Sequence, residues 1–278
     1  MNWKQTLFWS FSTAAIFYYF LLFGVFVFVG QEETQLFIPE WWYIREFLFQ
    51  PGGFCAVAGQ WIIQYYRQPM SAVVLHTVLL VGCGFMVYRI LRCFSDKTYL
   101  LFLSLLPVLY LVKMSIHGEY LVDGTVGVVL MLLALSVSLK VRRAGSIAGY
   151  GIASTLFLCG LTGLLSVCYA FLYTLLALLR YKTSRQRLAA AACLIPALFI
   201  YLFSGWLGIP VPLSDGWMPE AYLEIQRLPH YYMYRVWTFF TLSIVTMQIL
   251  ANQNIRSQLI TIEIVKNVVI DCLILRRT

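Results

Sequence analysis

Two adjacent carboxylates follow the first long apolar run of the chain, and their position makes them the first candidates for chemistry. Glu32 and Glu33 come directly after residues 7–29, a run without a charged side chain. A carboxylate held at a membrane surface can act as a general base or as a ligand for a divalent cation. We therefore treat Glu32 and Glu33 as candidate catalytic residues. The alternative is that both are ordinary solvated carboxylates at the end of an apolar segment.

Charged residues on later segments could bind a ligand. Arg45 and Arg67 lie on two short stretches rich in Trp and Tyr, and a guanidinium group is suited to binding a phosphate. A later loop adds His117, Glu119 and Asp123 as possible ligand-binding residues. One histidine and two carboxylates on one loop are a weak metal pattern, and the sequence contains no HExxH, Walker or G-x-G-x-x-G motif. The sequence therefore identifies no cofactor and predicts no metal site.

The composition indicates that lipid must cover most of the surface of this protein. Of the 278 residues, 61% are hydrophobic and 12% are charged, and the mean hydropathy is +0.78. Soluble globular domains carry about 25% charged residues. So few charges cannot cover a water-facing surface, and we expect an all-α, polytopic bundle of membrane-spanning helices.

The apolar runs divide the chain into about eight predicted spans, because a helix needs about 20 residues to cross the hydrocarbon core. Residues 146–179 are too long for one span, and Gly160 and Gly163 near the middle indicate a tight turn between two spans. A cleaved signal peptide is the alternative for the first run, but its length and bulky end favour an uncleaved span. The predicted spans are 7–29, 71–91, 98–113, 125–139, 146–160, 164–179, 188–206 and 232–250, within a transmembrane domain at 1–250 and before a cytoplasmic tail at 251–278.

The distribution of charge predicts the orientation. With eight spans, 15 of the 20 Lys and Arg residues fall on the side of the N-terminus. The positive-inside rule makes this side cytoplasmic and predicts a multi-pass membrane protein with both termini in the cytoplasm. The net charge of +8 could suggest nucleic acid in a soluble protein. Here the basic residues lie in short turns, where orientation and contact with anionic lipid explain them, so we expect no nucleic-acid partner.

The segment between the first two spans predicts a helical hairpin at the outer membrane surface. Its two pieces, within residues 37–68, are separated by Pro51-Gly52-Gly53, a strong helix breaker. In the second piece, Phe54, Trp61 and Tyr65 belong to an apolar stripe with helical spacing. Short amphipathic helices rich in Trp and Tyr are typical of the headgroup region, where we expect this interfacial hairpin to lie.

This arrangement resembles that of multi-spanning glycosyltransferases that use polyprenyl-phosphate sugars, which also carry an acidic residue just after the first span and a long outer loop with an interfacial helix. The resemblance covers residues 1 to about 70, and it implies Glu32 or Glu33 as base or metal ligand. Those enzymes usually have more than eight spans. The stretch from Glu32 to Pro69 also looks like an uncharacterised family of multi-pass membrane proteins found in Bacteroidota. This resemblance implies a location in the bacterial inner membrane and no particular activity.

Two classes of function follow as expectations. The first is a membrane enzyme that transfers a sugar from a lipid-linked substrate at the outer face, with Arg45 and Arg67 on the phosphate. The second is a non-catalytic membrane component that binds an envelope protein through the outer loops. A transporter comes third, because the predicted spans contain few polar side chains, such as His76 and Gln248. In every case the bilayer itself is a partner.

Overall fold

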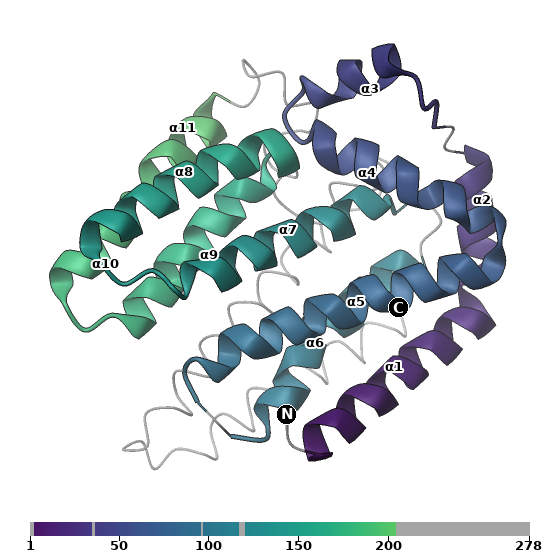
Figure 1. Ribbon diagram of the computed structural model, residues 1–278, viewed down its shortest axis with the longest axis horizontal. Helices are drawn as coiled ribbons and strands as arrows, with labels where there is room; N and C mark the ends of the chain where they lie inside the picture. Colours follow the sequence, from purple (N-terminus) through teal and green to yellow (C-terminus); the bar gives the residue numbers. More distant parts are fainter. Residues whose placement is uncertain (1–2, 35–36, 96, 117–119, 204–278) are drawn as a thin grey trace, which may run out of the picture. The chain divides into compact units, whose positions relative to one another are not determined.

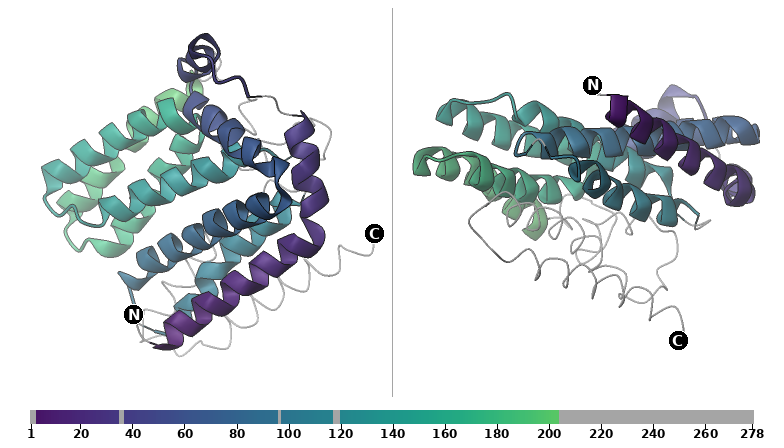
Figure 2. Two further views of the ribbon diagram at one scale, coloured as in Figure 1. Left: turned by 45° about the vertical axis from the view of Figure 1, so that its right-hand side comes forward. Right: turned by 90° about the horizontal axis from the view of Figure 1, so that it is seen from below.

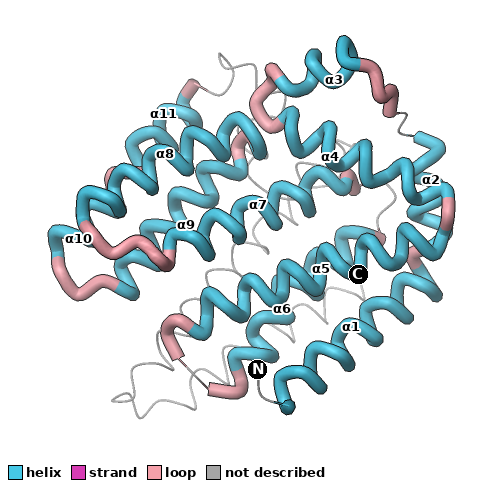
Figure 3. Tube along the Cα trace, viewed as in Figure 1, coloured by secondary structure: helices cyan, strands magenta, loops and turns pink. Residues whose placement is uncertain are grey.

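The computed structural model describes residues 3–34, 37–95, 97–116 and 120–203, which form helices and connecting turns without a β-strand among them (Figures 1 and 3). The chain divides into two compact units, Met1–Val236 and Trp237–Thr278, and all the described residues belong to the first. The all-α prediction is confirmed for these residues. The predicted span at 232–250 and the predicted tail at 251–278 lie outside them.

The first predicted span, 7–29, corresponds to two helices that meet at Gly24. Helix α1 covers Trp3–Phe23 and α2 covers Val25–Thr34. The left view of Figure 2 shows α2 leaving α1 at an angle. A Cβ atom at position 24 would lie 3.0 Å from ring atoms of both Phe20 and Phe28. Glycine therefore leaves the space in which these two buried rings approach each other, with 5.4 Å between their centroids.

The remaining helices follow the predicted apolar runs closely. Five of them match predicted spans, and the run at 188–206 is divided into two helices by a turn at 192–193. The elements are α3 Trp41–Leu48, α4 Gly53–Ile63, the 3-10 helix η1 Gln64–Arg67, α5 Pro69–Arg92, α6 Leu100–Ser115, α7 Val122–Ser138, α8 Ala144–Thr162, α9 Leu165–Arg180, α10 Ser184–Ala191 and α11 Leu194–Leu202.

Four helical segments among the described residues are long and apolar enough to cross a membrane. They are Trp3–Phe23, Pro69–Arg92, Ala144–Thr162 and Ser184–Leu202, the last of which includes α10 and α11. Helices α6, α7 and α9 are also apolar but shorter. Large apolar side chains cover the outside, including Phe26 at 86% exposure and Leu188 at 76%. Exposed apolar surface on this scale is typical of a protein that contacts lipid.

Helix α5 packs against α1, α6 and α7, whereas α8 and α9 pair with each other and with α10. Helix α7 connects these two groups because it also packs against α8 and α9, and α4 packs against both α7 and α8. The predicted hairpin is therefore present as α3 and α4, but α4 is also part of the helix packing. Phe54, Trp61 and Tyr65 of the predicted apolar stripe are exposed, as a lipid-facing stripe would be.

Two glycine turns hold this hairpin against the α8–α9 connection. Gly52 and Gly163 both have positive φ, +83° and +64°, which a residue with a Cβ rarely adopts. The Gly52 amide donates a hydrogen bond of 3.0 Å to the Gly160 carbonyl. A Cβ atom on Gly52 would lie 3.3 Å from the Gly163 nitrogen. The two turns predicted from Pro51-Gly52-Gly53 and from Gly160 and Gly163 are thus in direct backbone contact.

Candidate functional site

The candidate site lies where α4 crosses the beginning of α7. Cys55 and Gly59 are buried on the α4 face that packs against α7. A Cβ atom on Gly59 would lie 2.8 Å from the Asp123 nitrogen and 3.0 Å from its Oδ1. Gly127, one helical turn after Asp123, lies opposite Cys55, whose Sγ would be 3.7 Å from an added Cβ. Small residues therefore let the two backbones approach closely, as is common between membrane helices.

Of the three predicted ligand-binding residues that the structure describes, Asp123 is the buried one. It lies in the first turn of α7 and is 8% exposed. Free backbone N–H groups and the helix dipole favour a carboxylate at this end of a helix. Its Oδ1 atom is nevertheless buried without a hydrogen-bond partner among the described residues. An unpaired buried carboxylate oxygen is unfavourable. It can accept a hydrogen bond from a ligand that reaches it, or it can bind a cation.

Neighbouring polar residues fix the chain as it enters α7. The Gln31 side chain of α2 donates a hydrogen bond of 2.8 Å from Nε2 to the Tyr120 carbonyl. The hydroxyls of Tyr120 and Thr125 lie 3.2 Å apart. Gln31, Tyr120 and Thr125 are all buried. The end of α2 and the start of α7 are therefore joined directly beside Asp123.

A second buried polar pair lies on the same side of α2. The Tyr66 hydroxyl lies 3.2 Å from Nδ1 of His76, and both residues are buried. Phe28 contacts both rings, at centroid distances of 5.3 Å to Tyr66 and 4.3 Å to His76. Since Phe28 and Gln31 are three positions apart, one face of α2 contacts both polar groups. The Tyr66 hydroxyl thus gives the buried His76 ring a hydrogen-bond partner inside the fold.

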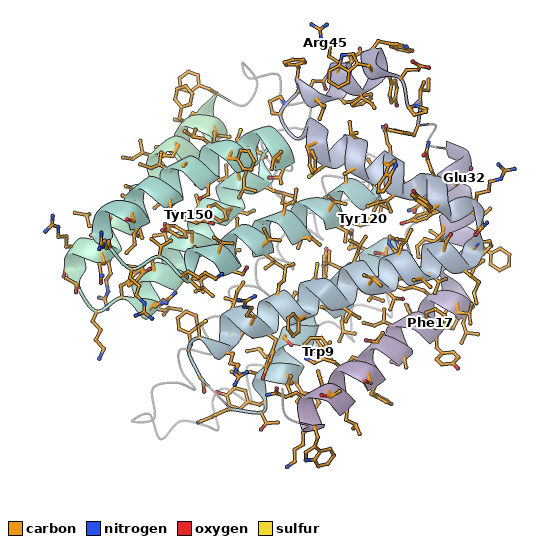
Figure 4. All side chains as sticks on the ribbon, viewed as in Figure 1. Trp9, Phe17, Glu32, Arg45, Tyr120 and Tyr150 are labelled. Carbon is orange, nitrogen blue, oxygen red and sulfur yellow. The ribbon has the colours of Figure 1, made fainter. Side chains whose placement is uncertain are left out.

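Among the described residues, the other predicted side chains do not converge on Asp123. Glu32 is partly buried on α2, while Arg45 on α3 and Arg67 on η1 are exposed. Figure 4 places Glu32 and Arg45 on separate elements and shows the Arg45 guanidinium directed away from α4. The ζ carbon of Arg45 lies 5.7 Å from the centre of the Phe49 ring. His117, Glu119 and the Glu33 side chain lie outside the described part of the chain.

Cys55 beside the carboxylate is not a nucleophile at neutral pH. Burial, with a smaller effect from the charge of Asp123, raises the pKa of the Cys55 thiol to about 12. A thiol needs to ionise before it attacks an electrophile or binds a metal. No group of three or more His, Cys, Asp or Glu residues within the described ranges could hold a metal ion. The site is therefore a buried carboxylate among neutral polar side chains.

Sequence reasoning missed Gln31, Cys55, Tyr66 and Tyr120 as members of these clusters. One signal was available for α4, because Cys55 and Gly59 are four residues apart and place small residues on one helical face. The apolar stripe with Phe54, Trp61 and Tyr65 was a more obvious pattern than this pair of small residues. Gln31 and Tyr120 have no comparable local pattern, since their hydrogen bond joins residues 89 positions apart.

Comparison with known families gives a match that extends over nearly the whole chain. A family model matches residues 1–273, and its description is a family of unknown function, DUF6057. The chain belongs to this family. Comparisons with curated proteins and with solved structures gave no match. Membership agrees with the predicted resemblance to an uncharacterised family and assigns no activity.

Proposed function

We propose that this DUF6057 protein is an integral protein of the bacterial inner membrane that crosses the bilayer about eight times, with both termini in the cytoplasm. Contacts between segments assigned to the same side support this topology. On the proposed outer side, Gln31 bonds to the Tyr120 carbonyl and the Gly52 amide bonds to the Gly160 carbonyl. Each of these bonds thus joins two segments that are far apart in sequence and that the proposed topology assigns to the same side of the membrane.

The proposed cytoplasmic side has matching contacts. The Tyr181 hydroxyl donates to the Val141 carbonyl at 2.7 Å, and Gln186 Nε2 donates to the Arg142 carbonyl at 2.9 Å. Gln5 near the N-terminus donates to the Tyr88 hydroxyl at 2.7 Å. None of these bonds joins a segment assigned to the outer side with one assigned to the cytoplasmic side.

For the molecular activity, we propose a non-catalytic membrane component that binds an envelope protein through α3. The exposed face of this helix supports the proposal. Helix α3 has no buried residue, and its first two residues, Trp41 and Trp42, are 69% and 62% exposed. Phe49, which follows the helix, is 80% exposed. Arg45 lies among them. Trp and Arg are the residue types that most often contribute strongly to protein–protein binding.

Helix α3 is held firmly in place for such a role. The Tyr43 hydroxyl donates to Gln60 Oε1 at 3.0 Å, and Gln64 Nε2 donates to the Phe37 carbonyl at 3.3 Å. The Gly52 turn fixes the other end of the helix against α8. A surface that is already ordered loses less conformational entropy when a partner binds.

A lipid-linked glycosyl-transfer enzyme is the second candidate, and the buried Asp123 is the observation that favours it. Gln31, which bonds to Tyr120, directly precedes Glu32, and Tyr120 directly follows residues 117–119. The described chain neighbours of these predicted carboxylates, Gln31 and Tyr120, are therefore joined beside Asp123. In this proposal a carboxylate of this group acts as base or metal ligand for the lipid-linked substrate.

A complementation experiment separates the two candidates. Cells that lack the native copy receive Trp42→Ala with Arg45→Ala, or Glu32→Gln with Glu33→Gln, or Asp123→Asn, and membrane levels are checked by immunoblot. The partner-binding proposal expects loss of envelope integrity, measured as detergent sensitivity, only for the α3 variant. A photo-crosslinker at position 42 should then give a defined protein adduct that the same crosslinker at Phe11, an exposed residue of α1, does not give. Loss only with the carboxylate variants, at normal protein level, would favour the enzyme instead.

A further inference from the structure

The strongest positive patch in the described part of the chain lies at the turns between α7 and α8 and between α9 and α10. These two turns and their flanks contain no acidic residue between Leu139 and Arg143 or between Arg180 and Arg187. All but Arg180 of their basic residues are exposed. We call this group the basic double turn, and it consists of Lys140, Arg142, Arg143, Arg180, Lys182, Arg185 and Arg187.

Hydrogen bonds hold the two turns together in spite of the repulsion between their charges. Two of the bonds cross between the turns, from the Tyr181 hydroxyl to the Val141 carbonyl and from Gln186 Nε2 to the Arg142 carbonyl. A third runs within the second turn, where Arg187 Nε donates to the Tyr181 carbonyl at 2.7 Å. Figure 1 shows α10 beside the ends of α8 and α9 that carry these residues. The fold thus keeps like charges close together in a fixed arrangement.

Two helix N-termini add to the positive character of this place. Helix α8 begins after Arg143 and α10 begins after Thr183, and neither N-cap residue makes a side-chain hydrogen bond to its helix. Helices α8 and α10 pack against each other. Free N–H groups in the first turn of a helix favour an anion. They point to the same kind of ligand as the arginines do.

Arg180 supplies the most specific observation. Its Nη1 atom is buried without a hydrogen-bond partner among the described residues. Its ζ carbon lies 5.7 Å from the centre of the Tyr181 ring, whose hydroxyl makes the first of the two bonds between the turns. A buried charged donor without an acceptor is unfavourable. An anionic oxygen bound between the two turns would satisfy it.

We propose that the basic double turn binds the headgroup of an anionic phospholipid with two phosphates, of the cardiolipin type, in the cytoplasmic leaflet. Basic pockets between membrane helices on the cytoplasmic side are suited to such headgroups. A single phosphate would neutralise only a small part of seven basic side chains. Leu188, which follows Arg187, is 76% exposed and offers an apolar surface for the acyl chains. The inference rests on the proposed membrane location.

Lipid binding to the purified protein tests this inference. The full chain, extracted in a mild detergent, is titrated with cardiolipin, phosphatidylglycerol or phosphatidylcholine, and bound lipid is counted by native mass spectrometry. We expect the order cardiolipin, then phosphatidylglycerol, then phosphatidylcholine. The variant Arg142→Gln, Arg143→Gln, Arg185→Gln should weaken cardiolipin binding at least about ten-fold, because each phosphate loses charge-assisted hydrogen bonds. Equal binding of cardiolipin and phosphatidylcholine would overturn the proposal.

A matched control separates a site from a general effect of charge. The variant Arg89→Gln, Arg92→Gln, Lys97→Gln removes the same number of exposed charges from the end of α5 and the connection to α6, and it should bind cardiolipin as the wild type does. Tyr181→Phe keeps every charge but removes a bond between the turns, and it should weaken binding several-fold. An equal loss in both charge variants would contradict a defined site.

Two further measurements show whether a negative result concerns the lipid, the binding site or the proposed membrane location. Full competition by inorganic pyrophosphate at the concentration at which cardiolipin binds would assign the site to a free anion and overturn the lipid assignment. Carbonate-washed membranes are assayed for the protein in parallel. A wild-type protein absent from these membranes would contradict the proposed location itself. A protein that is present there but binds cardiolipin without dependence on the basic double turn would contradict only this inference.

Discussion

At the scale of single residues, many buried hydroxyls of the described bundle bond to a carbonyl three or four residues earlier in their own helix, whereas a few polar groups pair with partners from distant segments. His76 in α5 lies against Tyr66 of η1, and Gln31 in α2 bonds to the Tyr120 carbonyl. A buried polar group without a hydrogen bond is expensive in an apolar environment. Each of these pairs therefore ties two elements together, whereas Asp123 Oδ1 is one of several buried side-chain atoms that have no hydrogen-bond partner among the described residues.

Tyr66→Phe should lower the stability of the protein. The change keeps the ring between Phe28 and His76 but leaves His76 without the hydroxyl at 3.2 Å. An unsatisfied buried group costs about 1–3 kcal/mol. Thermal unfolding in detergent, followed by a thiol-reactive dye, should show a lower midpoint for this variant. Tyr65→Phe, at an exposed neighbouring position, is the control and should unfold like the wild type.

Two cysteines should differ strongly in their reaction with a maleimide. Cys55 is buried and its thiol pKa is raised to about 12, whereas Cys93 is exposed. With that pKa, roughly one Cys55 thiol in a thousand is ionised at pH 9. In two variants whose single remaining cysteine is Cys93 or Cys55, Cys93 should react within minutes and Cys55 should stay unlabelled from pH 7 to 9. Rapid labelling of Cys55 in the folded protein would show that α4 does not pack as described.

At the scale of elements, α4 decides how the hairpin is attached to the bundle. The two faces of α4 differ in composition. Small residues lie on the face that approaches α7, and large apolar side chains such as Trp61 remain exposed on the other face. The close approach depends on Gly59, which leaves room for the backbone of Asp123. Small residues at the crossing compensate for the weak hydrophobic driving force between helices in lipid.

Gly59→Ala should separate α4 from α7. The added Cβ would lie 2.8 Å from the Asp123 nitrogen, so one of the helices has to move. Overpacking of this kind costs about 1–3 kcal/mol, which should appear as a lower unfolding midpoint. Gly82→Ala is the matched control, because a Cβ at that position in α5 meets no atom within 4 Å. Equal midpoints for both variants would show that the crossing can adjust without loss.

At the scale of the whole molecule, the hydrogen bonds between distant segments are consistent with one polar outer end and one basic cytoplasmic end. Tyr181 and Gln186 connect two basic turns, and Gly52 connects the hairpin to the α8–α9 turn. In a membrane protein the side on which a loop lies can be measured directly, so the proposed topology makes a sharp prediction.

A membrane-impermeant maleimide should distinguish the two ends in intact spheroplasts. In a chain without other cysteines, Gln50→Cys in the α3–α4 turn should react before the membrane is permeabilised. Native Cys93, which is exposed after α5, should react only after permeabilisation. Basic turns such as that containing Arg89 and Arg92 should stay in the cytoplasm by the positive-inside rule. The reverse result would invert the topology, and equal labelling at both positions would reject it.

Much of the helical architecture could be predicted from local sequence. Long apolar runs predicted the helices from α5 to α9, because backbone groups in an apolar environment need hydrogen bonds within their own segment. Gly160 and Gly163 predicted the turn between α8 and α9, and Gly163 indeed has positive φ. The break at Gly24 was missed, since the run at 7–29 remains apolar on both sides of the glycine.

The candidate site was much less predictable. Asp123 was among the predicted ligand-binding residues, but its proximity to Gly59 depends on how α4 crosses α7. The expected enzyme site combined Glu32 or Glu33 with Arg45 and Arg67 on one substrate, and the described structure leaves both arginines exposed on elements other than that of Glu32. Composition and spacing describe one segment at a time, and they contain no information on which helix faces meet.

The sequence by itself determined the helical class and where the charges lie along the chain, since both follow from local apolar length and from counting residues. Only the tertiary structure decided that Gly52 lies against Gly163, that Asp123 is buried beneath α4, and that the basic turns at Val141 and Tyr181 are joined. These contacts link residues that are far apart in sequence. They arise because helices pack where small side chains and hydrogen-bond partners match, and no single segment specifies that match.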